Sequence, residues 1–368
     1  MHWHKILTPL VAVAALATAA PGATAQNRGD DTLLEMQQAF RKGDKARLTA
    51  LLPAARGHAL EPWAAYWELR ARLDQAQPDE VADFLQRYAG TYQEDRLRND
   101  WLLLLGQRRN WDQFVDLHPH YRMGDDREVR CYALAIDQIK GQAGDDAGAE
   151  VLRNWYALRE LDDGCANAAA EMLAAKKIKP LDMWRKARLA AEANRLRVAR
   201  KAVEIVAPEA LAALREALDA PAKYLKGHAT ARGRERQELV VLALVRMAMS
   251  DAGVAASLLE NKWGVHLSAE ERNWLWGVIG KQAALALSPD AAGYFGNVSR
   301  DADLNDDLLA WKVRAALRAG QWKQVGRAID AMSPTARQDS TWTYWKARSL
   351  TAGRAGDEER AQARQLYE

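Results

Sequence analysis

The chain has 368 residues, with 52 Lys and Arg against 49 Asp and Glu, a formal net charge of +3 and 49% hydrophobic residues. This balance argues against a nucleic-acid-binding protein, because a face that follows phosphates normally brings a large basic excess. The length exceeds the size at which one compact core usually keeps growing, so we expect either two domains or an extended array of helices.

The first residues predict a signal peptide over 1–25. A short basic start at Lys5 is followed by an apolar run, Ile6 to Ala20, and by the small-x-small sequence Ala23-Thr24-Ala25. The run is shorter than the roughly 18 to 20 apolar residues of a membrane-spanning helix, and no later segment predicts a span. We therefore expect export, cleavage after Ala25 and a mature chain over 26–368 without a membrane span.

The rest of the chain predicts an all-α protein built of helical hairpins. No segment alternates apolar and polar residues with the period of a strand. Instead, an apolar-periodic helix, a short turn and a second helix recur, with turns at Gly43, between 106 and 110, near Asn194, at Gly320 and between 353 and 356. Because the spacing of these turns is uneven, we predict short antiparallel helical hairpins that form a degenerate tetratricopeptide-like α-solenoid.

Boundary residues agree with this division. Ser268 and Glu271 have the spacing of a capping box, just before an apolar helical face. Prolines fall between the periodic segments, where helices begin or end. They are Pro53, Pro62, Pro119, Pro180, Pro208, Pro221, Pro289 and Pro334.

The chain has only two cysteines, Cys131 and Cys165. In an exported protein such a pair is more often a disulfide than a redox pair or half of a zinc site. A zinc site would need two further ligands, and the nearby His118 and His120 are the sole candidate pair. We predict a disulfide between neighbouring hairpins and no metal site.

Tryptophan is unusually common, with 14 Trp against 4 Phe. Trp63, Trp67 and Trp311 lie on apolar helical faces, where a large ring fills the space between stacked hairpins. Aromatic faces also stack on sugar rings, so a minority of the tryptophans could line a groove that faces a glycan. We expect core packing for most of them.

Motifs of known enzymes do not occur: there is no Gly-rich phosphate loop, HExxH, GxSxG or pair of CxxC motifs. The paired acids fall in expected turns or helix starts, where carboxylates favour the positive end of the helix dipole. We therefore predict no catalytic residue, no cofactor-binding or metal-binding residue and no cofactor. The acidic pairs are Asp125-Asp126, Asp145-Asp146, Asp162-Asp163 and Asp306-Asp307.

Five segments follow the predicted signal in a fixed order. They are LLEMQQAFRKGDKARLTALLPAARGHALEPWAAYWELRARL, VADFLQRYAGTYQEDRLRNDWLLLLGQRRNWDQFVDLHP, REVRCYALAIDQIKGQ, DDGCANAAAEML and DSTWTYWKARSLTAGRAGDEERAQARQLYE. In this order, with the cysteines at matching places, the first four resemble the amino-terminal half of the soluble lytic murein transglycosylases of Gram-negative periplasms. The last resembles the final hairpins before that family's linker domain.

The resemblance implies a superhelical horseshoe of short antiparallel helical hairpins. It is the periplasmic, U-shaped domain that surrounds peptidoglycan glycan strands, with other cell-wall enzymes as candidate partners. In that family, a separate lysozyme-like domain cleaves the bond between N-acetylmuramic acid and N-acetylglucosamine and leaves a 1,6-anhydro end. A single glutamate serves there first as general acid and then as base. Its motif, which begins Glu-Ser and is followed by Gly-Leu-Met-Gln, does not occur here. We expect a fragment, the U-shaped domain over 26–368, that is inactive alone.

An exported helical-repeat scaffold that binds protein partners is the main alternative. A finished scaffold should close with a polar capping helix. Here the last residues keep apolar positions at Ala361, Ala363, Leu366 and Tyr367, which call for a neighbour. This ending favours the fragment over the scaffold.

Overall fold

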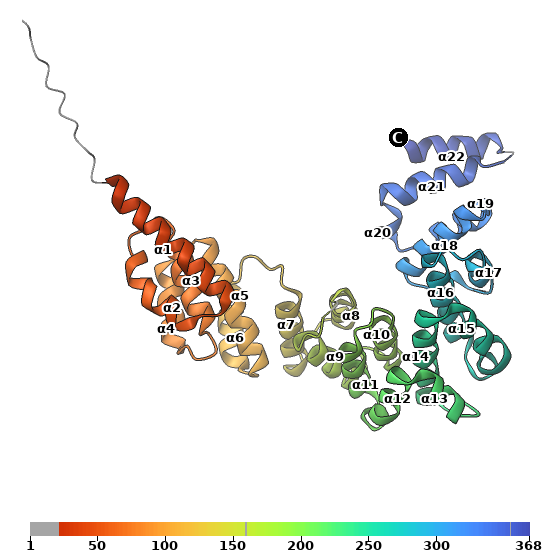
Figure 1. The fold of residues 1–368 in the computed structure, drawn as a ribbon, viewed down its shortest axis with the longest axis horizontal. Helices are drawn as coiled ribbons and strands as arrows, with labels where there is room; N and C mark the ends of the chain where they lie inside the picture. Colours follow the sequence, from red (N-terminus) through yellow and green to blue (C-terminus); the bar gives the residue numbers. More distant parts are fainter. Residues whose placement is uncertain (1–21, 159, 354) are drawn as a thin grey trace, which may run out of the picture. The chain divides into compact units, whose positions relative to one another are not determined.

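The computed structural model describes residues 22–158, 160–353 and 355–368, with side chains from residue 29 onward (Figure 1). Within these residues the chain consists of helices joined by turns, without a strand, which confirms the all-α prediction. No helix in this part of the chain has both the length and the apolar character that crossing a bilayer requires. Most of the predicted signal peptide, 1–25, lies outside the described residues.

The helices group into two compact units, Met1–Ala133 and Leu134–Glu368, and the boundary falls inside α7 (Arg127–Ile139). The other helices of unit 1 are α1 (Gly22–Lys42), α2 (Lys45–Leu51), α3 (Glu61–Ala71), α4 (Pro78–Arg87), α5 (Tyr92–Gln107) and α6 (Trp111–Leu117).

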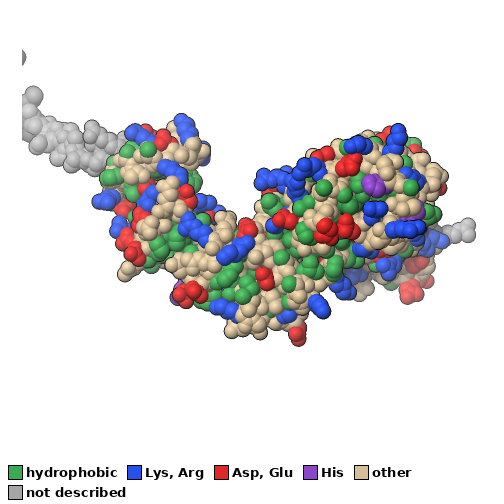
Figure 2. All heavy atoms as spheres, turned by 90° about the horizontal axis from the view of Figure 1, so that it is seen from below, with side chains coloured by type: hydrophobic (Ala, Val, Ile, Leu, Met, Phe, Trp, Pro, Cys, Tyr) green, Lys and Arg blue, Asp and Glu red, His purple; other side chains and the backbone are tan. Residues whose placement is uncertain are grey.

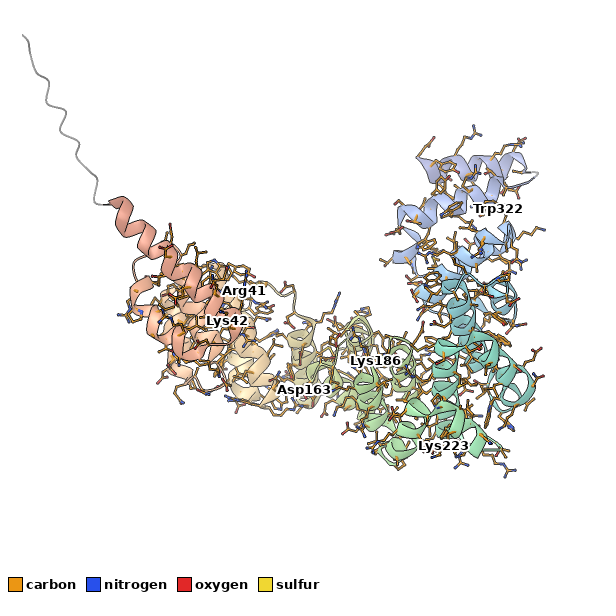
Figure 3. All side chains as sticks on the ribbon, viewed as in Figure 1. Arg41, Lys42, Asp163, Lys186, Lys223 and Trp322 are labelled. Atoms are coloured by element: carbon orange, nitrogen blue, oxygen red, sulfur yellow. The ribbon has the colours of Figure 1, made fainter. Side chains whose placement is uncertain are left out.

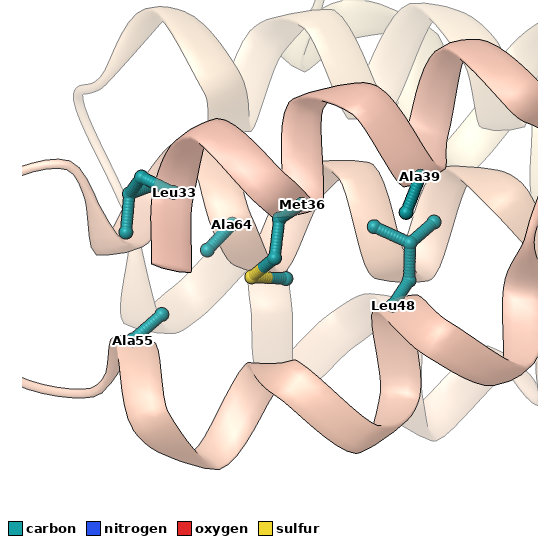
Figure 4. Packing of buried hydrophobic residues seen from close by; sticks show 6 residues of the cluster. All are labelled: Leu33, Met36, Ala39, Leu48, Ala55 and Ala64. Atoms are coloured by element: carbon teal, nitrogen blue, oxygen red, sulfur yellow. The ribbon is translucent and has the colours of Figure 1, made fainter. Parts of the chain in front are cut away.

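Unit 1 has two layers of helices. In the first layer, which we call the inner layer, α3 packs between α1 and α5, and α2, α4 and α6 pack against these helices as their hairpin partners. Apolar side chains fill the space between α1, α2 and α3, and their burial holds the first hairpin to the next helix. This core consists of Leu33, Met36, Ala39, Leu48, Ala55 and Ala64 (Figure 4).

Unit 2 contains the remaining helices. They are α8 (Ala147–Ala157), α9 (Gly164–Ala174), α10 (Pro180–Glu192), α11 (Leu196–Val206), α12 (Leu211–Asp219), α13 (Pro221–Gly227), α14 (Arg234–Ser250), α15 (Ala252–Leu258), α16 (Ala269–Leu285), α17 (Ala291–Gly296), α18 (Asp306–Arg318), α19 (Trp322–Asp330), α20 (Pro334–Arg337), α21 (Ser340–Thr351) and α22 (Asp357–Tyr367).

Unit 2 repeats the two-layer arrangement of unit 1. Its inner layer is formed by α10, α14, α16 and α18, each of which packs on the next. Each has a hairpin partner in the second layer: α11 on α10, α15 on α14, α17 on α16 and α19 on α18. The last hairpin, α21 with α22, packs on α19 through α21. The described helices of each unit are therefore the hairpin repeats that the sequence predicts.

The predicted turns are confirmed. Gly43 (φ 70°) separates α1 from α2, Asn194 (φ 57°) separates α10 from α11, and Gly320 (φ 68°) separates α18 from α19. Each residue ends a helix in the left-handed backbone region, which Gly adopts freely and Asn tolerates. The predicted turns at 106–110 and 353–356 likewise join α5 to α6 and α21 to α22.

Helix starts also follow the sequence. At the start of α16, Glu271 N donates to Ser268 Oγ at 3.3 Å and Ser268 N donates to Glu271 Oε2 at 2.6 Å, which is the predicted capping box. Proline occupies one of the first positions of several helices or 3-10 turns, as its fixed φ favours. These prolines are Pro53, Pro62, Pro119, Pro180, Pro208, Pro221 and Pro334.

Candidate functional site

Charged side chains of both signs are mixed on the face of the molecule in Figure 2. Lys and Arg lie among Asp and Glu on the helices in view, which accords with a net charge of only +3. Binding of a charged polymer on such a surface depends on local groups rather than on a field of one sign. Local clusters of aromatic and basic residues are therefore the places to look for a site.

An aromatic cluster lies where α1, α3 and α5 meet. The ring of Trp63 lies next to those of Tyr66, Trp67 and Tyr92, with centroids 5.9, 5.8 and 5.7 Å away. Phe40 of α1 stacks on Trp67 at 6.3 Å. Contacts of this kind stabilise the rings beyond the burial of their area, so the cluster holds its rings in fixed orientations.

One end of the cluster, Trp67 with Phe40, packs against the core of α1, α2 and α3, and the other end reaches the surface. Trp63 and Arg70 are seven residues apart and share one helical face. Glu68, on the opposite face, accepts a hydrogen bond from Thr49 of α2 at 2.9 Å. Two rings of the cluster remain accessible, since Tyr92 is 56% exposed and Trp63 is partly exposed.

Polar groups border the aromatic cluster. Tyr66 donates to Asp100 Oδ2 at 2.7 Å, and Arg70 Nε lies 3.0 Å from the same oxygen. Although burial lowers the pKa of Arg96, this residue is close enough to Tyr66 and Asp100 for their charges to raise it. Burial, with the charge of Asp100, raises the pKa of Tyr66 to about 12, so its hydroxyl remains a donor. We call the following residues the α3–α5 surface: Trp63, Tyr66, Arg70, Tyr92 and Arg96.

A groove of about 440 Å³ in unit 2 is a second candidate. It lies beside the turn between α16 and α17, where Leu287 and Trp311 contribute apolar walls and Arg314 and Arg318 contribute charge. The Arg314 guanidinium lies over Trp311 and Trp342, 4.9 and 5.2 Å from their ring centroids. Leu287 is 67% exposed and has a φ of 57°, an uncommon conformation for a leucine. This groove suits an apolar segment with acidic neighbours.

The inner layer of unit 2 contains a buried ion network. Arg188 on α10 donates from Nε and Nη2 to the two carboxylate oxygens of Glu238 on α14, each at 2.8 Å. Its Nη1 donates to Glu270 on α16 at 2.9 Å. Although desolvation lowers the pKa of Arg188, the two carboxylates raise it above its ordinary value. The network therefore links three helices through a permanently charged guanidinium.

A second network joins the same layer. Lys281 Nζ on α16 lies 2.5 Å from Glu192 Oε1 on α10 and 2.5 Å from Asp307 Oδ2 on α18. Glu192 is almost buried and Asp307 is exposed, so one side of the network meets solvent. Together, the two networks connect α10, α14, α16 and α18 by charge as well as by apolar packing.

Lys186 on α10 is a buried cation that faces backbone (Figure 3). Its Nζ donates to the carbonyl oxygens of Trp155 and, at 2.8 Å, of Leu158. These carbonyls lie at the carboxyl end of α8, where backbone carbonyls have no hydrogen-bond donor within the helix and a positive charge is favoured. Desolvation nevertheless lowers the pKa of Lys186 to about 8, despite the nearby Asp162.

Several acidic residues are buried, although the turns and charged helical faces in which the sequence places them are normally exposed. Glu238 and Glu271 are fully buried, and Glu94 is 3% exposed. Each has a partner: Arg188 for Glu238, the capped backbone for Glu271, and Arg122 Nη2 at 2.7 Å for Glu94. Of these, Glu94 and Glu271 have a capping spacing that can be read from the sequence, with Thr91 and Ser268 three residues before them, whereas Glu238 has none. Such partnered carboxylates serve the fold.

The two cysteines lie in helices. Cys131 on α7 and Cys165 on α9 are fully buried, and both are disulfide-bonded. Asp162 Oδ1 accepts a hydrogen bond from Cys165 N at 2.6 Å and so caps the start of α9. The candidate zinc ligands lie in the 3-10 turn His118–His120. The described part of the chain brings no group of three or more His, Cys, Asp or Glu side chains together for a metal.

The acidic pairs stand at helix starts, as their sequence positions predict. Asp126 Oδ1 accepts from Glu128 N at 2.9 Å in the first turn of α7. Asp146 and Asp163 directly precede α8 and α9, and Asp306 begins α18. Of these carboxylates, Asp126 caps the start of α7, and Asp306 joins neighbouring turns by accepting a hydrogen bond from Ser333 N at 2.7 Å.

The tryptophans divide into two groups. One group, fewer than half of the described tryptophans although the sequence predicts core packing for most, is buried in the core: Trp101, Trp155, Trp184, Trp263, Trp274 and Trp276. The other group is only partly buried: Trp63, Trp67, Trp111, Trp311, Trp322, Trp342 and Trp345. Trp63, Trp67 and Trp311 thus lie at the borders of the core, and they belong to or line the two candidate surfaces.

No family model and no curated protein matches the chain. Among solved structures, an inactive mutant of the lytic transglycosylase Slt from Pseudomonas aeruginosa has 25% sequence identity and a TM-score of 0.53, covering 91% of this chain and 55% of that chain. The 70-kDa soluble lytic transglycosylase of Escherichia coli has 16% identity and a TM-score of 0.47, over 93% and 55% of the two chains. A bulgecin A complex of the 70-kDa soluble lytic transglycosylase has 15% sequence identity and a TM-score of 0.45, again over 93% of this chain and 55% of that chain.

The chain spans about half the length of these enzymes, 55% in each case. The similarity to Slt extends over both units, since it covers 91% of the chain. It therefore confirms the resemblance to the soluble lytic transglycosylases that the order of the sequence segments predicts.

Proposed function

We propose that this chain is the non-catalytic helical part of a periplasmic lytic transglycosylase that acts on peptidoglycan. The observation that carries the proposal is the similarity to Slt, at 25% identity over 91% of this chain and 55% of Slt. In this proposal, residues 1–25 are a signal peptide and residues 26–368 are the helical domain that holds glycan strands. Cleavage of the MurNAc–GlcNAc bond to a 1,6-anhydro end belongs to another part of the enzyme.

The state of the buried carboxylates supports a non-catalytic role. A general acid for a glycosidic oxygen needs a carboxyl that stays protonated in an open cleft. Although burial raises the pKa of Glu94, hydrogen bonds from Arg122 and Arg98 lower it below its ordinary value. A carboxylate held in this way by guanidinium groups is a poor proton donor. Desolvation raises the pKa of Glu238, but its side chain is fully buried against Arg188 and Arg234 and so faces no open cleft.

The proposal is tested with the purified chain and isolated sacculi. We expect the chain to pellet with sacculi at low ionic strength and less at high ionic strength, because exposed charges are screened by salt. We expect chromatography of the supernatant to find no 1,6-anhydromuropeptides. A chain that stays in the supernatant at low ionic strength would overturn the peptidoglycan assignment, and anhydro products would overturn the non-catalytic one.

The groove beside the α16–α17 turn favours a second candidate function, an exported scaffold that binds protein partners. Its wall includes Leu287, which is 67% exposed, and its basic residues Arg314 and Arg318 suit an acidic, apolar segment. The pelleting assay separates the two candidates. A scaffold of this kind stays in the supernatant with sacculi, whereas the helical part of a transglycosylase pellets with them.

A further inference from the structure

We propose that the α3–α5 surface binds an anionic glycan strand, with its aromatic rings against a pyranose and its arginines against a sugar carboxylate. This inference rests on the proposed function, because the muramoyl residues of peptidoglycan glycans supply N-acetylated pyranose rings that carry a carboxylate. It assigns the glycan contact to one face of unit 1.

The aromatic residues of the surface are already ordered in a way that suits the binding of a sugar ring. Trp63 is held edge-on by Tyr66, with an interplanar angle of 83°, so its orientation is fixed before a ligand arrives. Tyr92 lies beside it at 5.7 Å and is 56% exposed. A pyranose presents C–H groups on one face, which pack on an aromatic face as other flat apolar groups do. Because the rings are already ordered, little entropy is lost when the sugar binds.

The basic part of the surface has more positive than negative charge. Arg70 and Arg96 both lie beside Tyr66, while Asp100 is the carboxylate that faces them. The Asp100 side chain is only 4% exposed and anchors the Arg70 guanidinium from below, while its charge also acts on Arg96. Arg70 uses its Nε for Asp100, and its other N–H donors remain at a side chain that is 44% exposed. Such a group pairs with an incoming carboxylate through charge-assisted hydrogen bonds.

The two parts are adjacent because of the helical spacing. Trp63 and Arg70 lie seven residues apart on α3, and Tyr92 and Arg96 lie four apart on α5, so each helix offers one aromatic residue and one arginine on the same side. Packing of α3 against α5 places the two pairs together. A sugar ring and its own carboxylate can therefore contact both kinds of group at once.

The test measures binding of the purified chain to two probes by calorimetry. One probe is peptidoglycan glycan from which an amidase has removed the stem peptides, and the other is a neutral chitooligosaccharide. Tyr92→Ala should weaken binding of both probes about tenfold, as the loss of a stacked ring does. Arg96→Gln should weaken binding of the anionic glycan by about the same factor and leave the neutral probe unchanged.

Matched controls come from outside the surface. Tyr344→Ala removes a tyrosine of α21 that is 48% exposed, and Arg87→Gln removes an arginine of α4 whose side chain is 53% exposed. Both controls should bind like the wild type. Thermal unfolding should show that every variant is folded at the temperature of the binding assay, since Tyr92 is exposed at the first position of α5.

The outcomes separate this inference from the proposed function. A wild-type chain that binds sacculi, with Tyr92→Ala and Arg96→Gln variants that bind the stripped glycan as tightly as the wild type, overturns the α3–α5 assignment alone. Binding to whole sacculi without binding to the stripped glycan does the same, since the contact would then be to stem peptides. A wild-type chain that binds neither sacculi nor glycan overturns both.

Discussion

Arg188 and Glu238 form two hydrogen bonds of 2.8 Å each while both side chains are fully excluded from solvent. Removing one partner leaves the other charge buried with a single remaining partner, Arg234 for Glu238 or Glu270 for Arg188, and breaking a buried pair typically costs about 3–5 kcal/mol. We expect Arg188→Met or Glu238→Gln to lower the free energy of unfolding by about that amount in urea titrations. The double variant should lose less than the sum of the two single changes, because the pair interacts directly.

An exposed pair provides the control for this prediction. Arg360 Nη2 lies 2.8 Å from Asp357 Oδ1, with both side chains largely exposed. Arg360→Met should cost less than about 1 kcal/mol, as solvent screens such pairs. If Arg360→Met and Arg188→Met lower the free energy of unfolding equally, burial does not set the contribution of the Arg188–Glu238 pair.

Lys186 should make stability depend on pH in the alkaline range. Burial lowers its pKa in the folded chain to about 8 from an ordinary value of 10.5, so the unfolded chain binds more protons between these values. The cost of the buried charge is fully present below pH 8 and disappears as the pH rises toward 10.5. Relative to Lys186→Met, the wild type should therefore gain free energy of unfolding between about pH 7 and about pH 9.5.

The comparison with Lys186→Met removes the contribution of other groups that titrate in this range. Urea titrations of both proteins at each pH give the difference. A difference that stays flat, or that falls as the pH rises, would show that Lys186 keeps an ordinary pKa in the folded chain.

The bridge proposed between Cys131 and Cys165 predicts that the oxidised, denatured chain releases no thiol to titration. Closing a loop of about 35 residues stabilises a fold by about 4 kcal/mol in the chain-entropy model. Reduction should thus lower the melting temperature of the wild type. The Cys131→Ser/Cys165→Ser variant should melt at the lower temperature with or without reductant, and two titratable thiols in the oxidised wild type would refute the bridge.

Gly106 should not tolerate a side chain. A Cβ at this position of α5 would lie 2.4 Å from Cδ2 of the fully buried Tyr132 ring of α7. Gly106→Ala should therefore cost about 1–3 kcal/mol of unfolding free energy through overpacking. Gly293→Ala is the matched control, since a Cβ there meets nothing within 4 Å, and it should be neutral or stabilising. Calorimetric melting of the two variants shows whether the loss of stability comes from the steric clash at Gly106 or from any replacement of glycine by alanine in a helix.

The local structure was readable from the sequence because its determinants are local. Gly43 and Gly320 mark turns since their left-handed backbone follows from residue type, and Ser268 marks a helix start because its capping partner is three residues away. The candidate surfaces were not readable in this way. Trp63 and Tyr92 meet only because α3 packs beside α5, and a single sequence does not give the rotation of one helix against another.

The buried charges illustrate the same limit. Arg188 and Glu238 are 50 residues apart, on helices separated by three others in the chain, and nothing in the neighbouring residues distinguishes them from exposed charges. Their burial results from the succession of inner-layer helices, which is a tertiary property. Tryptophan positions were predictable as apolar faces, whereas the partial exposure of Trp63 and Trp311 depends on which neighbouring helix ends nearby.

The two ion networks of unit 2 affect the order in which its helices unfold under force. A stack of hairpins with contacts only between neighbours is expected to unzip repeat by repeat from a free end. Arg188 and Lys281, however, each connect three helices, and Lys281 reaches from α10 to α18. Under a pulling force applied at Glu368, we therefore expect α22, α21 and α19 to peel away in small steps, and α18 through α10 to rupture in one large extension.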